Sequence, residues 1–527
     1  MLGHAIATAV LDTYAKLPDN GKPRRRSNQQ PEWTVLAAVC LYRHLDHASY
    51  DLRCVSLGTG LKALPHARLP VHGDVLHDSH AEIVARRGFK LWLYGQIDRA
   101  ARGERDGAHG ETDLLVERVN GGEWSLKPGW KAGFYVSTLP CGDASTYFLS
   151  LSAPVNDAVP PSSTISPRAT SASDPAANGA APTQHSALAV AASLGMHTSR
   201  DPLSPSPASS SLSASHAPSP APNFLTPASA AVHRGRASYS TFSILRTKPG
   251  RADSPPTTSH SCSDKLALWG LVGLQGALLA QAGVRRVPLE VLVVGGFERN
   301  EVEENGDAGR ERIRDECVRA LGGRIEGWAR RIGLREDEYR VPQVEFAERA
   351  FESARDVVAE REGVQVAGVV GCAESLSYVA DLGSAPAVEV ITNGIRQGAS
   401  AKRKPGQPLG LKNRSRLCKL SLFQKHLGLP DQPRGPAKHA LSSTSSPSLP
   451  LSPSALESLS PLKRYRLLKA LVRQPDEGAF AGWLVSGREW ESFDGEGHVR
   501  EDAARAGKEG GAEEGRSRAV VAGEVRA

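Results

Sequence analysis

The chain has 527 residues, of which 40% are hydrophobic and 23% charged, so it can bury a globular core. The formal net charge of +7 is compatible with a polyanionic partner, and the 36 prolines and 51 glycines predict unstructured inserts. The 7 scattered cysteines argue against a disulfide framework, and no apolar run approaches the ~18 residues of a membrane span. Because no signal peptide opens the chain, we expect an intracellular protein of the nucleus and/or cytoplasm, without a membrane.

The first part of the chain predicts a helix followed by two strands and a longer helix. Apolar residues recur at helical spacing in residues 4–16, and a basic loop follows at 23–26. Residues 33–42 and 50–57 are rich in β-branched and aromatic side chains, which favours strands. Residues 79–96 favour a helix that carries His80 and Glu82 on its opening turn.

Two later elements are predicted to adjoin cysteines. An apolar strand at 134–138 runs into Pro140 and Cys141, so Cys141 should lie at a helix N-terminus. Backbone N–H groups and the helix dipole favour a thiolate at such a position. Residues 263–282 are dense in leucine and alanine and predict a second core helix, with Cys262 at its start.

The C-terminal half predicts two buried strands and two charged helices. The strands are expected at 289–295 and 387–392, and the helices at 311–331 and 345–360. The alternation of strands and helices favours an α/β sandwich in which helices cover a mixed sheet.

Three segments are predicted to be disordered because they contain too few apolar side chains to offset the entropy of the chain. Residues 151–235 and 431–455 are Ser/Pro/Ala-rich inserts, and 496–527 is a polar tail. We expect a single domain over residues 1–495, interrupted by the two inserts, because the candidate site residues lie on both sides of the first insert.

One imidazole and two thiols form a candidate zinc site. His80, Cys141 and Cys262 are of the types that zinc prefers, and three protein ligands leave a fourth position open for water, as in catalytic sites. Glu82 follows His80 at the spacing of the acid/base residue in zinc-dependent nucleobase deaminases. The simple deaminase pattern ends Pro-Cys-x-x-Cys, but Ala144 occupies the last position, which makes Cys262 the best candidate for the third ligand.

Each of these residues also has an ordinary interpretation. Ser79 and Glu82 fit a capping box at a helix start. A lone His80 is more often a partly buried histidine, and lone cysteines are more often small buried hydrophobes. The flanking Pro-Cys-Gly-Asp and Ser-Cys-Ser-Asp-Lys sequences make a chance combination a poor explanation.

Together, these segments resemble the deaminase domain of the adenosine-to-inosine RNA editing enzymes. The matching residues are 57–62, 80–82, 140–143, 245–250, 261–265, 269–276, 415–419 and 465–469. The resemblance implies a cytidine-deaminase-like three-layer α/β sandwich with a mixed sheet. It also implies zinc on His80, Cys141 and Cys262, which lowers the pKa of bound water to about 7. Glu82 then carries protons during hydrolysis at C6 of adenosine, which gives inosine and ammonia.

The same resemblance implies a buried inositol hexakisphosphate near the zinc. Its binding set consists of basic and aromatic side chains, namely Arg86, Arg87, Lys265, Trp269, Lys419, Lys469 and Trp483. A buried cluster of like charges needs a polyanion to neutralise it, whereas solvated helix charges are the alternative. The sequence departs from the family at Leu268, where arginine is frequent, at Ala277, where some members have serine, and at 484–486, which lack an acidic–basic pair.

Candidate RNA contacts are basic residues in loops. They are Lys62, Lys402, Arg403, Lys404, Lys412, Arg414, Arg416, Arg24, Arg25 and Arg26. Such residues provide salt-dependent affinity without sequence recognition, and a nuclear-import signal or a solvated loop are the alternatives.

We expect tRNA as the substrate, because the deaminase core begins almost at Met1 and leaves no room for double-stranded-RNA-binding modules. This favours the branch of the family that deaminates adenosine 37 of alanine tRNA, and a base in an anticodon loop is readily extruded. Alternatives are a messenger-RNA or free-nucleoside deaminase, or a non-catalytic RNA-binding protein with a structural zinc. Glu82 argues against the last, since a structural site needs no acid/base residue. No obligate protein partner is evident.

Overall fold

The computed structural model describes residues 1–46, 49–104, 114–119, 122–152, 233–234, 241–248, 254–296, 299–381, 387–430, 459–485 and 490–499. The inserts expected at 151–235 and 431–455 and the tail expected at 496–527 lie almost entirely outside these described residues. In the part of the chain that the structure describes, no helix has both the length and the apolar character needed to cross a membrane.

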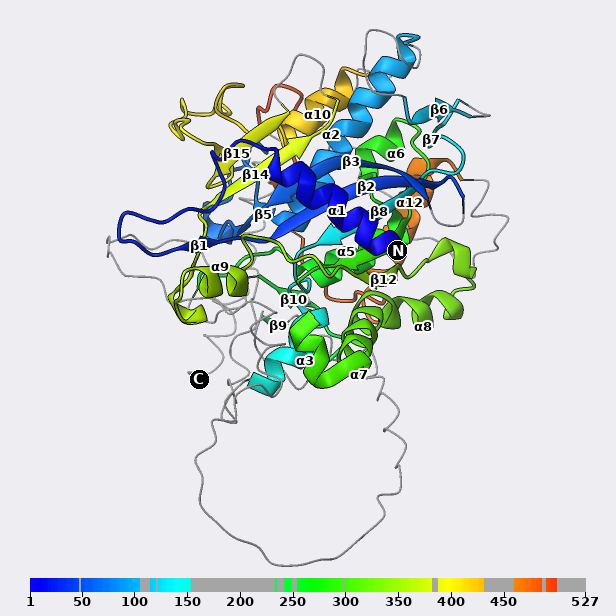
Figure 1. Cartoon of the computed structure of the whole chain (residues 1–527). Helices are drawn as coiled ribbons and strands as arrows, with labels where there is room; N and C mark the ends of the chain where they lie inside the picture. Colours follow the sequence, from blue (N-terminus) through cyan, green and yellow to red (C-terminus); the bar gives the residue numbers. More distant parts are fainter. Residues whose placement is uncertain are drawn as a thin grey trace, which may run out of the picture.

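An 8-stranded mixed sheet forms the centre of the fold, in the order β12-β11-β8-β2-β3-β14-β15-β16 (Figure 1). Its strands are β2 (Leu36–His44), β3 (Tyr50–Thr59), β8 (Lys131–Val136), β11 (Leu289–Val294), β12 (Gln343–Phe346), β14 (Glu374–Val379), β15 (Val388–Thr392) and β16 (Ile395–Arg396). Strands β8, β11 and β12 are parallel to one another, and the other neighbouring pairs are antiparallel. The mixed sheet expected from the sequence is therefore confirmed.

Four two-stranded pairs lie outside this sheet. They are β1 (Glu32–Trp33) with β13 (Val370–Gly371), β4 (Leu61–Ala63) with β5 (Asp78–His80), β6 (Val116–Arg118) with β7 (Trp124–Leu126), and β9 (His233–Arg234) with β10 (Arg246–Thr247). The β4–β5 pair matters for the site, because it places Leu61 opposite His80.

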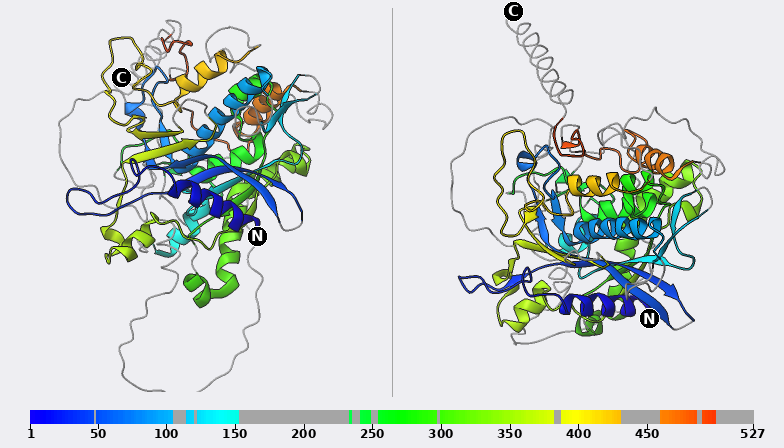
Figure 2. Two further views of the ribbon diagram at one scale, coloured as in Figure 1. Left: turned by 45° about the horizontal axis from the view of Figure 1, so that its top comes forward. Right: turned by 90° about the horizontal axis from the view of Figure 1, so that it is seen from above.

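Helices cover both faces of the sheet, which gives the three expected layers (Figure 2). Side chains alternate along β2, so that Leu36, Ala38 and Cys40 pack with helix α1 (Leu2–Ala15). Ala37, Val39 and Leu41 face the opposite layer, built from α2 (Ala81–Ala101), α5 (Cys262–Val272), α6 (Gly276–Gln281), α10 (Lys419–Leu427) and α12 (Pro461–Leu471). This alternation follows from the two-residue period of a strand.

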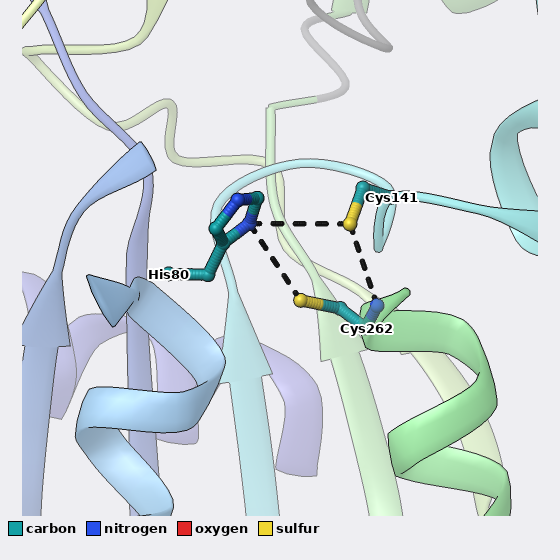
Figure 3. A group of neighbouring side chains, drawn as sticks. All are labelled: His80, Cys141 and Cys262. Carbon is teal, nitrogen blue, oxygen red and sulfur yellow. Dashed lines mark hydrogen bonds between the residues drawn. The ribbon is translucent and has the colours of Figure 1, made fainter. Parts of the chain in front are cut away.

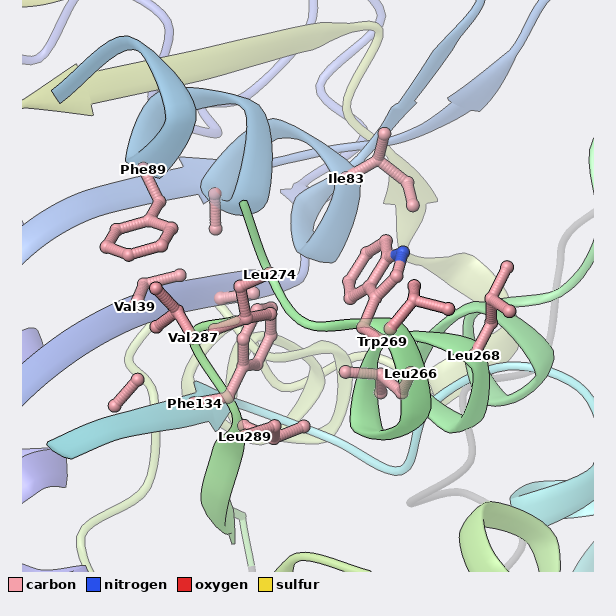
Figure 4. Close-up of a cluster of buried hydrophobic side chains, with 14 of the residues drawn as sticks. Val39, Ile83, Phe89, Phe134, Leu266, Leu268, Trp269, Leu274, Val287 and Leu289 are labelled. Carbon is pink, nitrogen blue, oxygen red and sulfur yellow. The ribbon is translucent and has the colours of Figure 1, made fainter. Parts of the chain in front are cut away.

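The second of these layers holds the larger core. Figure 4 shows Phe134 of β8 and Leu289 of β11 beneath Phe89 of α2 and Trp269 of α5. The remaining helical elements are η1 (His66–Arg68), α3 (Asp143–Ser152), α7 (Arg299–Val318), η5 (Arg319–Gly323), α8 (Arg324–Arg331), η6 (Glu336–Glu338), α9 (Arg355–Arg361) and η7 (Val366–Gly368).

Several predicted helix boundaries need correction. The helix expected at 263–282 is two helices, because Gly273 has a positive φ of 87°, which favours glycine, and ends α5. The helix expected at 79–96 begins only at Ala81, and His80 is the last residue of β5. The charged helix expected at 311–331 is interrupted by the π-helical turn η5.

The helix predicted at 345–360 is present only in its last part. Residues 343–346 form β12, which pairs in parallel with β11, and α9 begins only at Arg355. The charge-rich composition favoured a helix locally, but pairing with a buried strand determined the structure at the sheet edge.

Candidate active site

The imidazole and the two thiols predicted as zinc ligands meet at one point (Figure 3). His80 Nδ1 lies 3.9 Å from Cys141 Sγ and 3.8 Å from Cys262 Sγ, and the ligand atoms all lie within 4.8 Å of one another. Zinc bonds of about 2.0 Å to nitrogen and about 2.3 Å to sulfur, at tetrahedral angles, separate such atoms by about 3.6 Å. The donor types and their spacing therefore fit a zinc ion.

Three separate segments supply these ligands. His80 ends β5 and is the N-cap residue of α2, Cys141 lies in the turn between β8 and α3, and Cys262 is the first residue of α5. The capping box that Ser79 and Glu82 could form is absent, since the N-cap is His80 and the cap makes no side-chain hydrogen bond. The ordinary interpretation of this motif therefore does not apply.

The two cysteine-bearing turns are held together by the small polar residues around them. Ser263 donates its backbone N–H to the Cys141 carbonyl at 3.0 Å, and the Cys262 N–H points to Cys141 Sγ at 3.3 Å. Gly142 adopts a φ of 101°, and a Cβ there would lie 2.2 Å from Ser261 Oγ. Only glycine tolerates both that conformation and that approach.

Glu82 lies on the first turn of α2, one residue beyond the start of the helix, and is 3% exposed. Burial raises the pKa of its carboxyl, and the neighbouring Cys141 thiolate adds to the rise. A carboxyl with a raised pKa can take up and release a proton nearer neutral pH, as a general acid/base must.

Two buried charged residues beside the ligands were not identified from the sequence. Lys248 is 3% exposed, and its Nζ lies 3.1 Å from Cys262 Sγ and 2.9 Å from Asp78. Asp78 also accepts from Lys265 Nζ at 2.6 Å. Burial opposes the charge on Asp78, but Lys248 and Lys265 outweigh it and hold the pKa of that carboxyl well below its usual range. Lys248 lies within the matching segment 245–250, and Asp78 lies two residues before His80. These positions are the one feature of the sequence that could have identified the two residues.

A cavity of about 570 Å³ adjoins this cluster, and all seven residues predicted to bind the inositol phosphate line it. They come from α2, α5, α10, α12 and the segment after α12, and they are Arg86, Arg87, Lys265, Trp269, Lys419, Lys469 and Trp483. The cavity wall also includes Arg473, His260, Tyr465 and Leu268, which the prediction did not assign to ligand binding.

The cavity is strongly basic. Six lining residues are lysine or arginine and two are carboxylates, Asp78 and Glu491, which leaves an excess of four positive charges. Tyr465 lies among these cations: burial opposes ionisation of its phenol, but Lys469 and Arg86 more than compensate, and its pKa is lowered. Such a cavity is suited to a polyanion.

The predicted RNA contacts fall into two groups. Lys62, Lys402, Lys404, Lys412 and Arg24 are exposed. The other five, Arg25, Arg26, Arg403, Arg414 and Arg416, donate hydrogen bonds to protein groups, although Arg25, Arg26 and Arg403 are also exposed.

Arg403 shows how these arginines are used. It makes two 3.0 Å hydrogen bonds to the buried Asp74, which also accepts from the Leu409 N–H at 2.7 Å. Arg416 donates to the backbone carbonyl of Ala387 at 2.7 Å. These contacts anchor the loop that carries the exposed lysines 402 and 404.

Comparison with known proteins gives consistent matches. The adenosine-deaminase (editase) domain family matches residues 56–471. The tRNA-specific adenosine deaminase 1 of Mus musculus is 29% identical over 457 residues, which cover 78% of this chain and 84% of that protein. The human protein of the same name is 28% identical over 479 residues, covering 80% and 86%. The double-stranded RNA-specific editase Adar of Drosophila melanogaster is 32% identical over 114 residues, covering 21% and 16%.

Proposed function

The chain belongs to the adenosine-deaminase (editase) domain family, and from this premise we propose that it converts adenosine to inosine in tRNA by zinc-dependent hydrolysis. The observation that carries the proposal is the meeting of His80, Cys141 and Cys262, from three separate segments, beside a buried Glu82. A non-catalytic zinc site does not need a buried carboxyl that is not itself one of the ligands.

The choice of tRNA is supported by the length of the matches. The relatives that align along more than four fifths of their own length are named tRNA-specific adenosine deaminases, whereas the RNA editase aligns over 16% of its length. The further proposal, adenosine 37 of alanine tRNA, follows from the branch of the family that the sequence resembles. The exposed Lys62, Lys402 and Lys404 are proposed to contact the RNA backbone.

Each residue of the site has a proposed task. His80 Nδ1 and the two thiolates would hold the zinc, which supplies Lewis acidity and makes water a better nucleophile at neutral pH. The carboxylate of Glu82 takes a proton from the attacking water and delivers it to the purine ring nitrogen. It then takes the second proton of that water from the new hydroxyl on C6 and delivers it to the amine, which leaves as ammonia as the C6 carbonyl forms. Burial of Glu82 keeps this proton carrier away from bulk solvent.

We also propose that the basic cavity binds inositol hexakisphosphate. The excess of four positive charges supports this ligand, because uncompensated buried cations are costly. Lys248, Asp78 and Lys265 form a continuous chain of contacts from Cys262 to the cavity wall. The cavity can therefore contribute to the position of a metal ligand.

The decisive assay incubates the purified chain with an alanine tRNA transcript and sequences the cDNA, in which inosine reads as guanosine. We expect adenosine to be read as guanosine at position 37, no such change in the same transcript incubated without the protein, and little release of ammonia from free adenosine. Failure on every tRNA, with zinc bound, would contradict the proposal.

Glu82→Ala tests the assigned chemistry. The variant should retain zinc and tRNA binding, because Glu82 is not among the metal-binding group, while inosine formation falls by about 10²- to 10⁴-fold or more. Elemental analysis and a tRNA binding assay monitor the retained properties. Wild-type activity in this variant would show that another group carries the proton.

A further inference from the structure

One wall of the basic cavity is formed by three side chains that contact one another: Arg473, Trp483 and His260. The Arg473 guanidinium lies over the Trp483 ring at 4.4 Å from its centroid. The His260 ring stacks on the same indole, with centroids 4.1 Å apart and planes inclined by 27°. Trp483 thus fixes a cationic group and an imidazole at the cavity surface.

Each of the two polar side chains has a buried N–H group without a hydrogen-bond partner among the residues that the structure describes. The Nε of Arg473 is inaccessible to solvent and has no hydrogen-bond partner among the residues that the structure describes. When the flat face of a guanidinium stacks on a ring, its N–H groups still point outward in the guanidinium plane and can donate hydrogen bonds. His260 is 1% exposed, and its Nε2 accepts from the Leu484 N–H at 2.8 Å, which places the proton on Nδ1. Nδ1 likewise has no partner within the described part of the chain.

Other cations of the cavity are already engaged with protein groups. Lys265 is paired with Asp78 at 2.6 Å and Lys419 with Glu491 at 3.1 Å. Arg86 donates to the Leu274 carbonyl at 3.0 Å. Tyr465 and then Glu491 are the groups whose negative charge raises the pKa of Arg473, and Glu491 is shared with Lys419.

The α5 wall of the cavity contributes little charge of its own. Leu268 lines the cavity and is apolar, so Lys265 is the cation that α5 presents there. Arg473 follows the end of α12 by two residues and lines the same cavity. Burial lowers the pKa of Arg473 to about 10, which is the direction expected of a cation that lacks a full set of anionic partners.

We propose that Arg473 is a phosphate-binding residue of this cavity, held in place by Trp483 and assisted by the Nδ1–H of His260. It supplies from the end of α12 the cationic contact that Leu268 does not supply from α5. This inference rests on the proposed inositol phosphate ligand. It identifies Arg473 as the residue that sets how firmly a highly phosphorylated inositol is retained.

The test uses the full-length chain, its R473A and R473K variants, and K463A as the control, since Lys463 is exposed on α12 and does not line the cavity. After dialysis at high salt for increasing times, bound inositol phosphate is extracted with acid and quantified by mass spectrometry. Loss of one charge-assisted contact should speed release from R473A by about tenfold to hundredfold. R473K, which keeps the charge but not the stacked planar group, should lie between R473A and wild type, and K463A should match wild type.

The outcomes separate this inference from the one on which it rests. Wild-type release kinetics in R473A would overturn the role of Arg473 and leave the ligand in place. Should R473A be insoluble, R473K decides: faster release supports the proposal, and wild-type release overturns it. If the wild-type protein neither carries inositol phosphate nor binds added inositol hexakisphosphate, both the role of Arg473 and the proposed ligand are overturned. Inosine formation in the same sample reports separately on the deaminase activity.

Discussion

Lys248→Met is the substitution that most directly tests how the charged cluster supports the metal ligands. The Lys248 ammonium lies 3.1 Å from Cys262 Sγ and 2.9 Å from Asp78, and the Lys248 side chain is 3% exposed. Burial disfavours its charge, but Asp78 and then Cys262 outweigh burial and raise the pKa of Lys248 above its usual range. Methionine has a similar length and flexibility and removes the charge.

The expected cost follows from the contacts that remain. Removing one partner of a buried ion pair typically costs about 3–5 kcal/mol, because the other charge is left uncompensated. Asp78 would keep its contacts with Lys265 Nζ and Ser259 Oγ, each at 2.6 Å. We therefore expect the free energy of unfolding to fall by about 3 kcal/mol, at the lower end of that range. That is a large part of the ~5–15 kcal/mol by which domains are stable. The unfolding midpoint should fall by about 4 °C for a domain of this size.

Calorimetry on purified protein measures the midpoint, and elemental analysis of the same sample measures zinc. The control is Lys425→Met, since Lys425 is an exposed lysine on α10. We expect a lower midpoint and reduced zinc content in K248M alone. A midpoint and zinc content equal to those of the control would refute the argument that Lys248 stabilises Asp78 and the Cys262 thiolate.

Three further substitutions probe separate parts of the site. Cys262→Ala should lose bound zinc, as measured by elemental analysis, and a full metal complement would mean that another residue is the ligand. Arg403→Ala removes both hydrogen bonds to the buried Asp74 and should weaken tRNA binding by loosening the lysine-bearing loop, with little change in zinc content; unchanged affinity in a filter-binding assay would argue against an anchoring role. Gly142→Ala places a Cβ 2.2 Å from Ser261 Oγ in a left-handed conformation and should lower the thermal midpoint, with zinc lost at lower temperature than from wild type.

The candidate metal-binding residues were predictable because each lies in a short local pattern. His80 lies on the opening turn of a predicted helix, and Cys141 and Cys262 lie in the motifs Pro-Cys-Gly-Asp and Ser-Cys-Ser-Asp-Lys. Short motifs of this kind can be recognised from the sequence alone. Their convergence was not predictable from spacing, since Cys262 lies 182 residues from His80 and 121 from Cys141. Family resemblance provided that step.

The residues that were missed interact over long distances in the sequence. Lys248 pairs with Asp78 across 170 residues, and neither has a periodic pattern that reveals burial. Arg473 follows a charged helix whose composition is typical of a solvated surface. The first part of the helix predicted at 345–360 failed for the same reason, because Glu345 and Phe346 became a strand only through pairing with the distant β11.

The contacts between the candidate metal site and the basic cavity make the two energetically interdependent. Asp78 is shared by Lys248, which contacts the Cys262 thiolate, and by Lys265, which lines the cavity. Burial lowers the pKa of Lys265, so its charge depends on anions nearby. The proposed polyanion would stabilise that charge and leave Asp78 free to compensate Lys248. Without the polyanion, one carboxylate must serve two buried ammonium groups, and the group nearest the metal ligand loses part of its support.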